Sequence, residues 1–136
     1  MDARPRAWQD NEMRRYTNST SFKRSNCAVA CTLDLIGDKW TLLIIRDMFF
    51  GKTRYKEFQD SEEGIPTNIL TNRLRKLESA GLVAKSPYQK NPVRYEYRLT
   101  EAGQSLGPIL KSIINWAREY IPGVRRPKAS QTRTTG

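Results

Sequence analysis

The sequence predicts a mainly α-helical fold that carries one small two-stranded β-hairpin, an α+β arrangement. Three observations predict it. Apolar residues recur at helical spacing in "GIPTNILTNRLRKLESAGLV", residues 64–83. Apolar and polar residues then alternate over 93–99, the period-two pattern of a half-buried strand. A second long stretch of helical spacing, residues 101–121, follows that strand.

Length and charge bound the organisation of the chain. Its 136 residues suit one domain with a hydrophobic core, which we expect at residues 26–121. A basic arm, partly disordered, is expected at 1–25, and a flexible basic tail at 122–136. The 24 Lys and Arg residues exceed the 14 Asp and Glu residues, for a formal net charge of +10. This excess favours a polyanionic partner, either nucleic acid or an anionic membrane surface.

The composition gives little support to several functional classes. The chain has no histidine, no glycine-rich phosphate loop and only two cysteines, Cys27 and Cys31. We therefore expect no enzyme activity, no bound metal and no cofactor. No apolar run approaches the roughly 18 residues that a membrane span needs, and residues 1–16 lack the apolar segment of a signal peptide. We expect a cytoplasmic protein with no membrane partner.

The first half of the domain is predicted to form short helices. One helix is expected over 27–36, and Gly37 suits its C-terminal end. Asp38 suits the N-cap of a second helix, which Gly51 closes. The sequence "TRYKEFQD" at 53–60 predicts a short strand or turn that leads into a short helix.

The helix within residues 64–83 is the clearest prediction. At about 100° per residue, its apolar face is expected to consist of Pro66, Leu70, Leu74 and Leu77, with Ile69 on the flank. We expect this helix to run from Pro66, at its first position, to Ala80, and Gly81 suits its C-terminal end.

A hairpin and a long helix complete the domain. Residues 82–88 are expected to pair with 93–99, and "QKNP" is expected to form the loop between them. Thr100 suits the cap of a helix that reaches Tyr120, and Pro108 should kink it or make its first turns irregular.

The order of these elements predicts a winged helix-turn-helix. In that motif the second helix of the pair enters the major groove of DNA, and the β-ribbon lies beside it as a wing. The exposed face of the 66–80 helix carries the donors and acceptors that base edges and phosphates require. The predicted DNA-binding residues are Thr67, Asn68, Thr71 and Asn72 for bases, Arg75 and Lys76 for phosphates or bases, and Lys90 and Arg94 of the wing for phosphates.

The local charge agrees with this interpretation, although alternatives stay open. Between Ile65 and Arg98 there are seven cations and two carboxylates, a net charge of +5. Taken alone, the polar helix face could be ordinary solvated surface, and the wing cations a charged hairpin tip. A protein-interaction module on the same fold, or a small enzyme or redox protein, are the rival functions. Further phosphate contacts could come from Arg125, Arg126 and Lys128 of the tail.

Three stretches carry a family resemblance: "CTLDLIGDKWTLLIIRDMFFGKTRYKEFQD", "GIPTNILTNRLRKLESAGLV" and "PVRYEYRLTEAGQSLGPILKSIINWA". They resemble the HxlR-type winged helix-turn-helix transcriptional regulators of bacteria, a MarR-like family. The resemblance implies a homodimer that binds a double-stranded operator, with N- and C-terminal helices forming much of the dimer interface. The expected interface residues are Leu106, Ile109, Leu110, Ile113, Trp116 and Tyr120.

The resemblance also points to Cys27. Family members often begin with Cys-Pro-Val, and in several that cysteine senses oxidants or electrophiles. Here Ala28 replaces the proline, and Cys31 is an additional thiol one helical turn on. Residues i and i+4 of a helix place their Cβ atoms about 5–6 Å apart, whereas a disulfide requires about 3.5–4.5 Å. An oxidant should therefore produce a sulfenic acid or an intersubunit disulfide. The alternative for Cys27 is a small buried hydrophobic residue.

Two further points follow from single positions. The family usually has Ser or Thr where this chain has Pro66, so the helix cap departs from the pattern there. A small-molecule effector is an alternative to an oxidant, and Trp40, Trp116 and Tyr120 are candidates to line its pocket at the dimer interface. Aromatic residues at helical spacing more often belong to a core.

Overall fold

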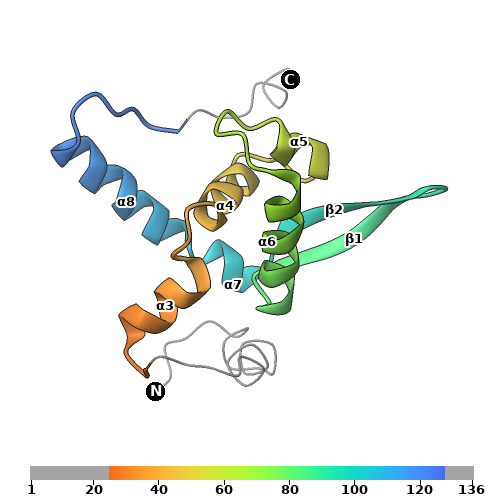
Figure 1. Cartoon of the computed structure of the whole chain (residues 1–136), viewed down its shortest axis with the longest axis horizontal. Coiled ribbons are helices and arrows are strands. Elements are labelled where there is room, and N and C mark those ends of the chain that lie inside the picture. Colours follow the sequence, from red (N-terminus) through yellow and green to blue (C-terminus); the bar gives the residue numbers. More distant parts are fainter. Residues whose placement is uncertain (1–24, 128–136) are drawn as a thin grey trace.

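The computed structural model describes residues 25–127. The elements are α3 Ala28–Ile36, α4 Thr41–Phe49, α5 Tyr55–Gln59, α6 Thr67–Ser79, β1 Val83–Lys90, β2 Val93–Leu99, α7 Glu101–Gln104 and α8 Gly107–Tyr120. In Figure 1, α4, α5 and α6 lie at the centre, the β1–β2 ribbon projects to one side, and α3 and α8 extend on the other. The predicted order of helices and hairpin is confirmed. The arm predicted at 1–25, apart from Ser25, and residues 128–136 of the predicted tail lie outside the described residues.

The hydrophobic core lies where the central helices meet the base of the ribbon. The three leucines of the predicted α6 face are buried, with 0%, 2% and 1% of Leu70, Leu74 and Leu77 exposed. Ile45 of α4 and Phe58 of α5 pack in the same cluster. Burial of a large apolar side chain contributes about 1.5–3 kcal/mol, so these residues hold α6 against the rest of the domain.

Helix α6 begins one residue later than the sequence predicts. Pro66 is its N-cap, with φ −62° and ψ 144°, and Thr67 is the first helical residue. The proline ring restricts φ to a helical value but leaves ψ free to be extended. Pro66 has no side-chain group to cap the helix, and it is exposed rather than part of the apolar face.

The ribbon is longer and its loop shorter than predicted. Strand β1 continues to Lys90, so only Asn91 and Pro92 separate the strands, in place of the expected four-residue loop. The register shifts between Pro87 and Gln89, which leaves Tyr88 as an extra residue on β1. A bulge of this kind absorbs one residue without ending the ladder, and alternation along the sequence does not reveal it.

The single long helix predicted after the ribbon is two helices. Thr100 caps the first as expected, and its hydroxyl accepts a hydrogen bond from the Gly103 N–H at 3.2 Å. The second, α8, has Pro108 in its first turn, where a missing N–H is tolerated. Leu106 lies between the two helices. Only 4% of it is exposed and it packs in the core of the domain, although the family resemblance placed it at the dimer interface.

Candidate nucleic-acid interface

The surface of α6 opposite its leucines carries exposed polar side chains. Thr67, Asn68, Thr71, Asn72 and Arg75 are all exposed. Among residues 25–127, the side chains of Asn68 and Arg75 have no hydrogen-bond or ion-pair partner. The amide and guanidinium groups of these two residues are therefore available to bases and phosphates.

Helix α5 holds the amino-terminal end of α6. The Tyr55 hydroxyl lies 3.0 Å from the Thr67 carbonyl oxygen, to which it donates, and 2.8 Å from the Thr71 hydroxyl. Gln59 donates from Nε2 to the Thr67 hydroxyl at 3.2 Å. Sequence reasoning missed Tyr55 and Gln59, because a pattern along one helix does not show which residues on another helix contact it. Both threonine hydroxyls serve the contact between the two helices.

The cations of α6 divide between two sides of the helix. Arg73 donates from Nε to Asp38 at 2.8 Å and from Nη1 to the side-chain oxygen of Asn72. Lys76 is half-buried and donates from Nζ to the Asp34 backbone carbonyl of α3 at 3.0 Å. Lys76 therefore lies toward α3, away from the other predicted DNA-binding residues, and Arg75 is the exposed cation of this helix.

Asp38 links α6 to the start of α4. Its Oδ2 accepts the backbone N–H groups of Trp40 at 3.0 Å and Thr41 at 3.1 Å. The N-cap residue of α4 is Trp40, however, two residues after the predicted Asp38, so Asp38 binds the turn that precedes the helix. Burial raises the pKa of this carboxyl, but hydrogen bonds from Thr41, Arg73 and Trp40 outweigh burial and lower the pKa to about 2. The carboxylate is therefore ionised at neutral pH, and it joins two helices.

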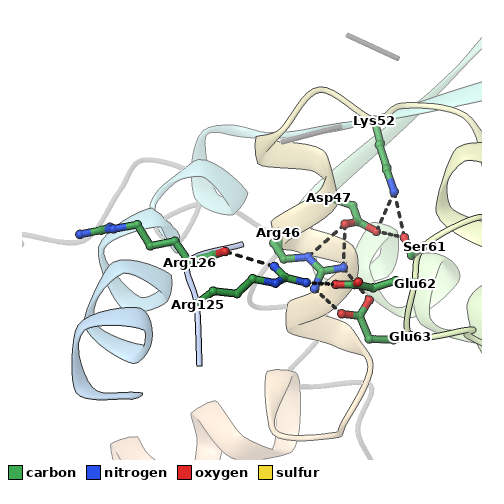
Figure 2. Close-up of polar contacts among 8 residues, drawn as sticks. All are labelled: Arg46, Asp47, Lys52, Ser61, Glu62, Glu63, Arg125 and Arg126. Atoms are coloured by element: carbon green, nitrogen blue, oxygen red, sulfur yellow. Dashed lines mark hydrogen bonds and ion pairs between the residues drawn. The ribbon is translucent and has the colours of Figure 1, made fainter. Parts of the chain in front are cut away.

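A network of charged groups holds the turn between α5 and α6 (Figure 2). Arg46 of α4 donates to both Glu63 oxygens at 2.8 Å and to Asp47 Oδ1 at 2.9 and 3.1 Å. Asp47 is 5% exposed and also accepts from the Ser61 hydroxyl, while Lys52 lies 3.7 Å away. The hydrogen bonds from Arg46 lower the pKa of Glu63. Each buried charge therefore has an opposite charge beside it, as burial requires.

The wing supplies cations beside α6. Lys90 and Arg94 are exposed near the turn of the ribbon. Arg98 lies closer to the domain and pairs with Glu96 at 3.1 Å. The Lys85 ammonium lies 4.5 Å from the centroid of the Tyr95 ring. Lys90 and Arg94, the predicted phosphate-binding pair, therefore lie on the end of the ribbon that projects from the domain.

The two cysteines lie at the start of α3 as free thiols. Cys27 is the exposed N-cap residue, and backbone hydrogen bonds from Ala30 and Val29 lower the pKa of its thiol. Cys31 donates from Sγ to the Ser25 carbonyl at 3.3 Å. Cys27 is thus not the buried hydrophobic residue of the alternative interpretation. The thiolate is the reactive form of cysteine.

Helices α3 and α8 expose a group of large apolar side chains. Val29 and Leu33 of α3 are 65% and 54% exposed. Four of the predicted interface residues of α8 are also exposed, Ile109, Ile113, Trp116 and Tyr120, whereas Leu110 partly packs on the core. We refer to Val29, Leu33 and these four residues as the α3/α8 face.

Within one chain, the three aromatic residues predicted to line a pocket at the dimer interface do not all meet, and that pocket stays a prediction. Trp116 and Tyr120 pack on each other with ring centroids 5.4 Å apart, but Trp40 packs against the core. A cavity of about 340 Å³ lies instead between α4 and α8. Its lining includes Leu43, Phe50, Ile114 and Pro127.

Among residues 25–127, no three His, Cys, Asp or Glu side chains gather in a way that could hold a metal ion. Within the same range, no helix is long and apolar enough to cross a membrane.

Comparison with known proteins agrees with this architecture. Residues 35–125 match the model of the HxlR-like helix-turn-helix family. The HTH-type transcriptional regulator Rv3095 of Mycobacterium tuberculosis is 42% identical over 100 residues, which are 74% of this chain and 63% of that protein. The chain thus matches less than two thirds of the length of that relative.

Solved structures give the same result. PA1607 superposes with a TM-score of 0.69 and 41% identity, over 86% of this chain and 82% of that chain. The oxidised form of the redox regulator HypR superposes with a TM-score of 0.63 and 36% identity, over 75% of this chain and 100% of that chain. The fold, the site geometry and these matches lead to one conclusion: the chain belongs to the HxlR-like helix-turn-helix family of transcriptional regulators.

Proposed function

We propose that this protein is a sequence-specific regulator that binds a pseudo-palindromic DNA operator as a homodimer. One observation carries the proposal: α6 exposes Asn68, Asn72 and Arg75 beside a wing whose Lys90 and Arg94 are also exposed. Asn reads adenine edges, Arg reads guanine edges or binds phosphate, and wing cations bind phosphate. No catalytic activity is part of this proposal, and its place of action is the bacterial cytoplasm.

The α3/α8 face supports the homodimer. Large apolar side chains left exposed on a monomer surface mark protein interaction sites, and the face includes Trp116 and Tyr120, residue types that dominate interfaces. We assign this face to a second copy of the chain. Two copies of α6 would then enter successive major grooves about 34–36 Å apart. The boundaries of the domain at 26–121, and of its basic flanks, belong to the same proposal.

An oxidant acting at Cys27 is the signal that the structure favours. Its thiol is exposed, and the hydrogen bonds at the start of α3 lower its pKa. The thiolate would attack one oxygen atom of hydrogen peroxide and break the O–O bond, which forms a sulfenic acid. The other oxygen atom would leave as hydroxide and become water on protonation. Condensation with a thiol of the other subunit would form a disulfide and release a second water. The similarity to the redox regulator HypR supports this assignment. The cavity between α4 and α8 is the alternative site for a small-molecule effector.

Selection of bound duplexes from random oligonucleotides, with and without peroxide, tests function, half-site spacing and redox response together.

Asn72→Ala should relax the preference for one base pair of the selected sequence and cost about 1–3 kcal/mol of binding free energy. Lys90→Ala should weaken binding evenly across sequences. Unchanged preference in Asn72→Ala would show that Asn72 does not read bases.

A matched salt titration separates this proposal from the protein-interaction alternative. DNA affinity should fall steeply with salt. A plot of the logarithm of the binding constant against the logarithm of salt concentration should have a slope of about −0.9 for each phosphate contact. A protein that shifts no duplex at low salt would refute DNA binding.

Cys27→Ser should bind DNA normally and lose the response to peroxide. A retained response would refute the redox assignment.

A further inference from the structure

Arg54 lies at the junction between the helix-turn-helix and the wing. It is the N-cap residue of α5 and forms an isolated antiparallel bridge with Glu96 of β2. Beside it, the Thr53 carbonyl accepts the Tyr97 N–H at 2.7 Å. Residues 53 and 54 are therefore held against β2 by one bridge and one backbone hydrogen bond, without forming a further strand. These contacts connect the base of the wing to the helix that holds α6.

The side chain of Arg54 is stacked on the wing. Its guanidinium carbon lies 3.8 Å from the centroid of the Tyr88 ring. Tyr88 is the extra residue of the β1 bulge, so its ring does not follow the regular alternation of the strand. This cation–π contact restricts an arginine that would otherwise sample many rotamers. The bulge thus provides a platform that orients Arg54.

The hydrogen-bonding edge of Arg54 is not used within the described chain. Among residues 25–127, its guanidinium has neither a hydrogen bond nor an ion pair, and the residue is exposed. Arg46, Arg73 and Arg98, by contrast, each bind a carboxylate. A guanidinium stacked through its face keeps its in-plane N–H groups free to bind a carboxylate or phosphate in bidentate fashion.

The surrounding charges favour an anion. Side chains two residues apart on a strand share one face of the ribbon, so Arg94, Glu96 and Arg98 point to the same side as Arg54. The one carboxylate of this set, Glu96, pairs with Arg98 at 3.1 Å. Arg54 and Arg94 are thereby left as two cations on one face, with no carboxylate bound to either within residues 25–127.

We propose that Arg54, oriented by Tyr88, binds a phosphate of the DNA backbone between α6 and the wing. This inference rests on the proposed DNA binding and extends it to a residue outside α6 and the ribbon tip. Because Tyr55 holds Thr67 and Thr71, the position of Arg54 is coupled to the amino-terminal end of α6. The contact would set the register of the helix on the duplex without reading sequence.

Fluorescence anisotropy with two labelled duplexes tests the proposal. One duplex is selected by the protein from random oligonucleotides, and the other has an unrelated sequence. Over a series of KCl concentrations, Arg54→Gln should bind both duplexes about tenfold more weakly and lower the salt slope by about one unit. Tyr88→Ala should weaken binding about two- to fivefold, because the arginine remains but is no longer oriented. Tyr88→Phe keeps the ring and should bind like the wild type.

Lys56→Gln is the matched control, because Lys56 is an exposed cation of α5 that pairs with Asp60 at 3.4 Å. It should leave affinity and slope unchanged. Circular dichroism and the melting temperature establish that each variant is folded. If Arg54→Gln does not fold, Arg54→Lys replaces it, and this variant should keep the slope but lose affinity, since an ammonium lacks the planar fork.

The outcomes distinguish this inference from the proposed function. Wild-type affinity and slope in a folded Arg54→Gln protein would overturn the inference alone. A loss confined to the selected duplex would also overturn it, because a phosphate contact acts on both. Wild-type protein that binds neither duplex would overturn DNA binding, and the inference with it.

Discussion

The helix-turn-helix and the α3/α8 face differ in whether their side chains find partners within one chain. Around the helix-turn-helix, leucines of α6 are buried, and the charges of Arg46, Asp47 and Glu63 are paired within the chain. Helix α8 has no buried residue at all, although Trp116 and Ile113 are large and apolar. The difference indicates that the helix-turn-helix is completed by one chain. The α3/α8 face leaves apolar area in water, which is why we assign it to a second copy.

Two equivalent leucine truncations should have the largest effects, one in each region. Leu74→Ala removes a fully packed side chain and should lower the free energy of unfolding by about 3 kcal/mol. Leu33→Ala removes the same atoms from the α3/α8 face, where Leu33 is 54% exposed. Its effect should depend on protein concentration, because it would act through dimerisation. Urea denaturation at two concentrations measures both, and a concentration-independent loss of similar size in Leu33→Ala would contradict the distinction.

Trp116→Ala should act on association rather than on folding of the subunit. Trp116 is 60% exposed in one chain, and truncating an interface tryptophan costs roughly 2 kcal/mol or more. Sedimentation velocity should therefore show a dimer dissociation constant raised by about thirtyfold or more. Ser112→Ala, an exposed polar position of the same helix, is the control. A Trp116→Ala protein that dimerises like the wild type would remove this residue from the interface.

Asp47→Asn tests the charged network on the helix-turn-helix side. The substitution keeps the shape of the side chain but leaves the half-buried Arg46 with one carboxylate partner fewer, so about 2 kcal/mol of stability should be lost. Asp60→Asn is the matched control, because Asp60 is paired but exposed and such pairs contribute about 0–1 kcal/mol. Thermal and urea unfolding compare the two. Equal effects would show that burial adds nothing to the Asp47 network.

The smallest effect should come from Asp38 and should depend on pH. Its pKa is about 2 in the folded protein against an ordinary value of 3.8, so the unfolded chain binds the proton more tightly. The stabilisation is therefore complete above about pH 4 and is lost as the pH falls toward 2. After allowance for solvent screening it is about 1 kcal/mol. The stability difference between wild type and Asp38→Asn should shrink over that range, and a constant difference would contradict the linkage.

The sequence alone predicted the order of the elements, and it predicted a DNA-binding site on α6 and the wing. Helical spacing located α6 and its buried leucines, alternation located β2, and a net charge of +5 marked the segment from α6 to the wing. These signals are local, because each residue's side of a helix or strand follows from its spacing and polarity. For the same reason they located the exposed Asn68 and Asn72.

The contacts between side chains of different elements follow from packing and could not be predicted from the sequence. Lys76 donates to the Asp34 carbonyl, and Leu106 is buried in the core. The Tyr55 hydroxyl bonds to Thr67 and Thr71. Each of these contacts joins a helix to a partner that local spacing does not identify, so the packing of the elements decides it. Spacing showed that α8 is amphipathic, but only the packed domain showed that its apolar side remains uncovered within one chain.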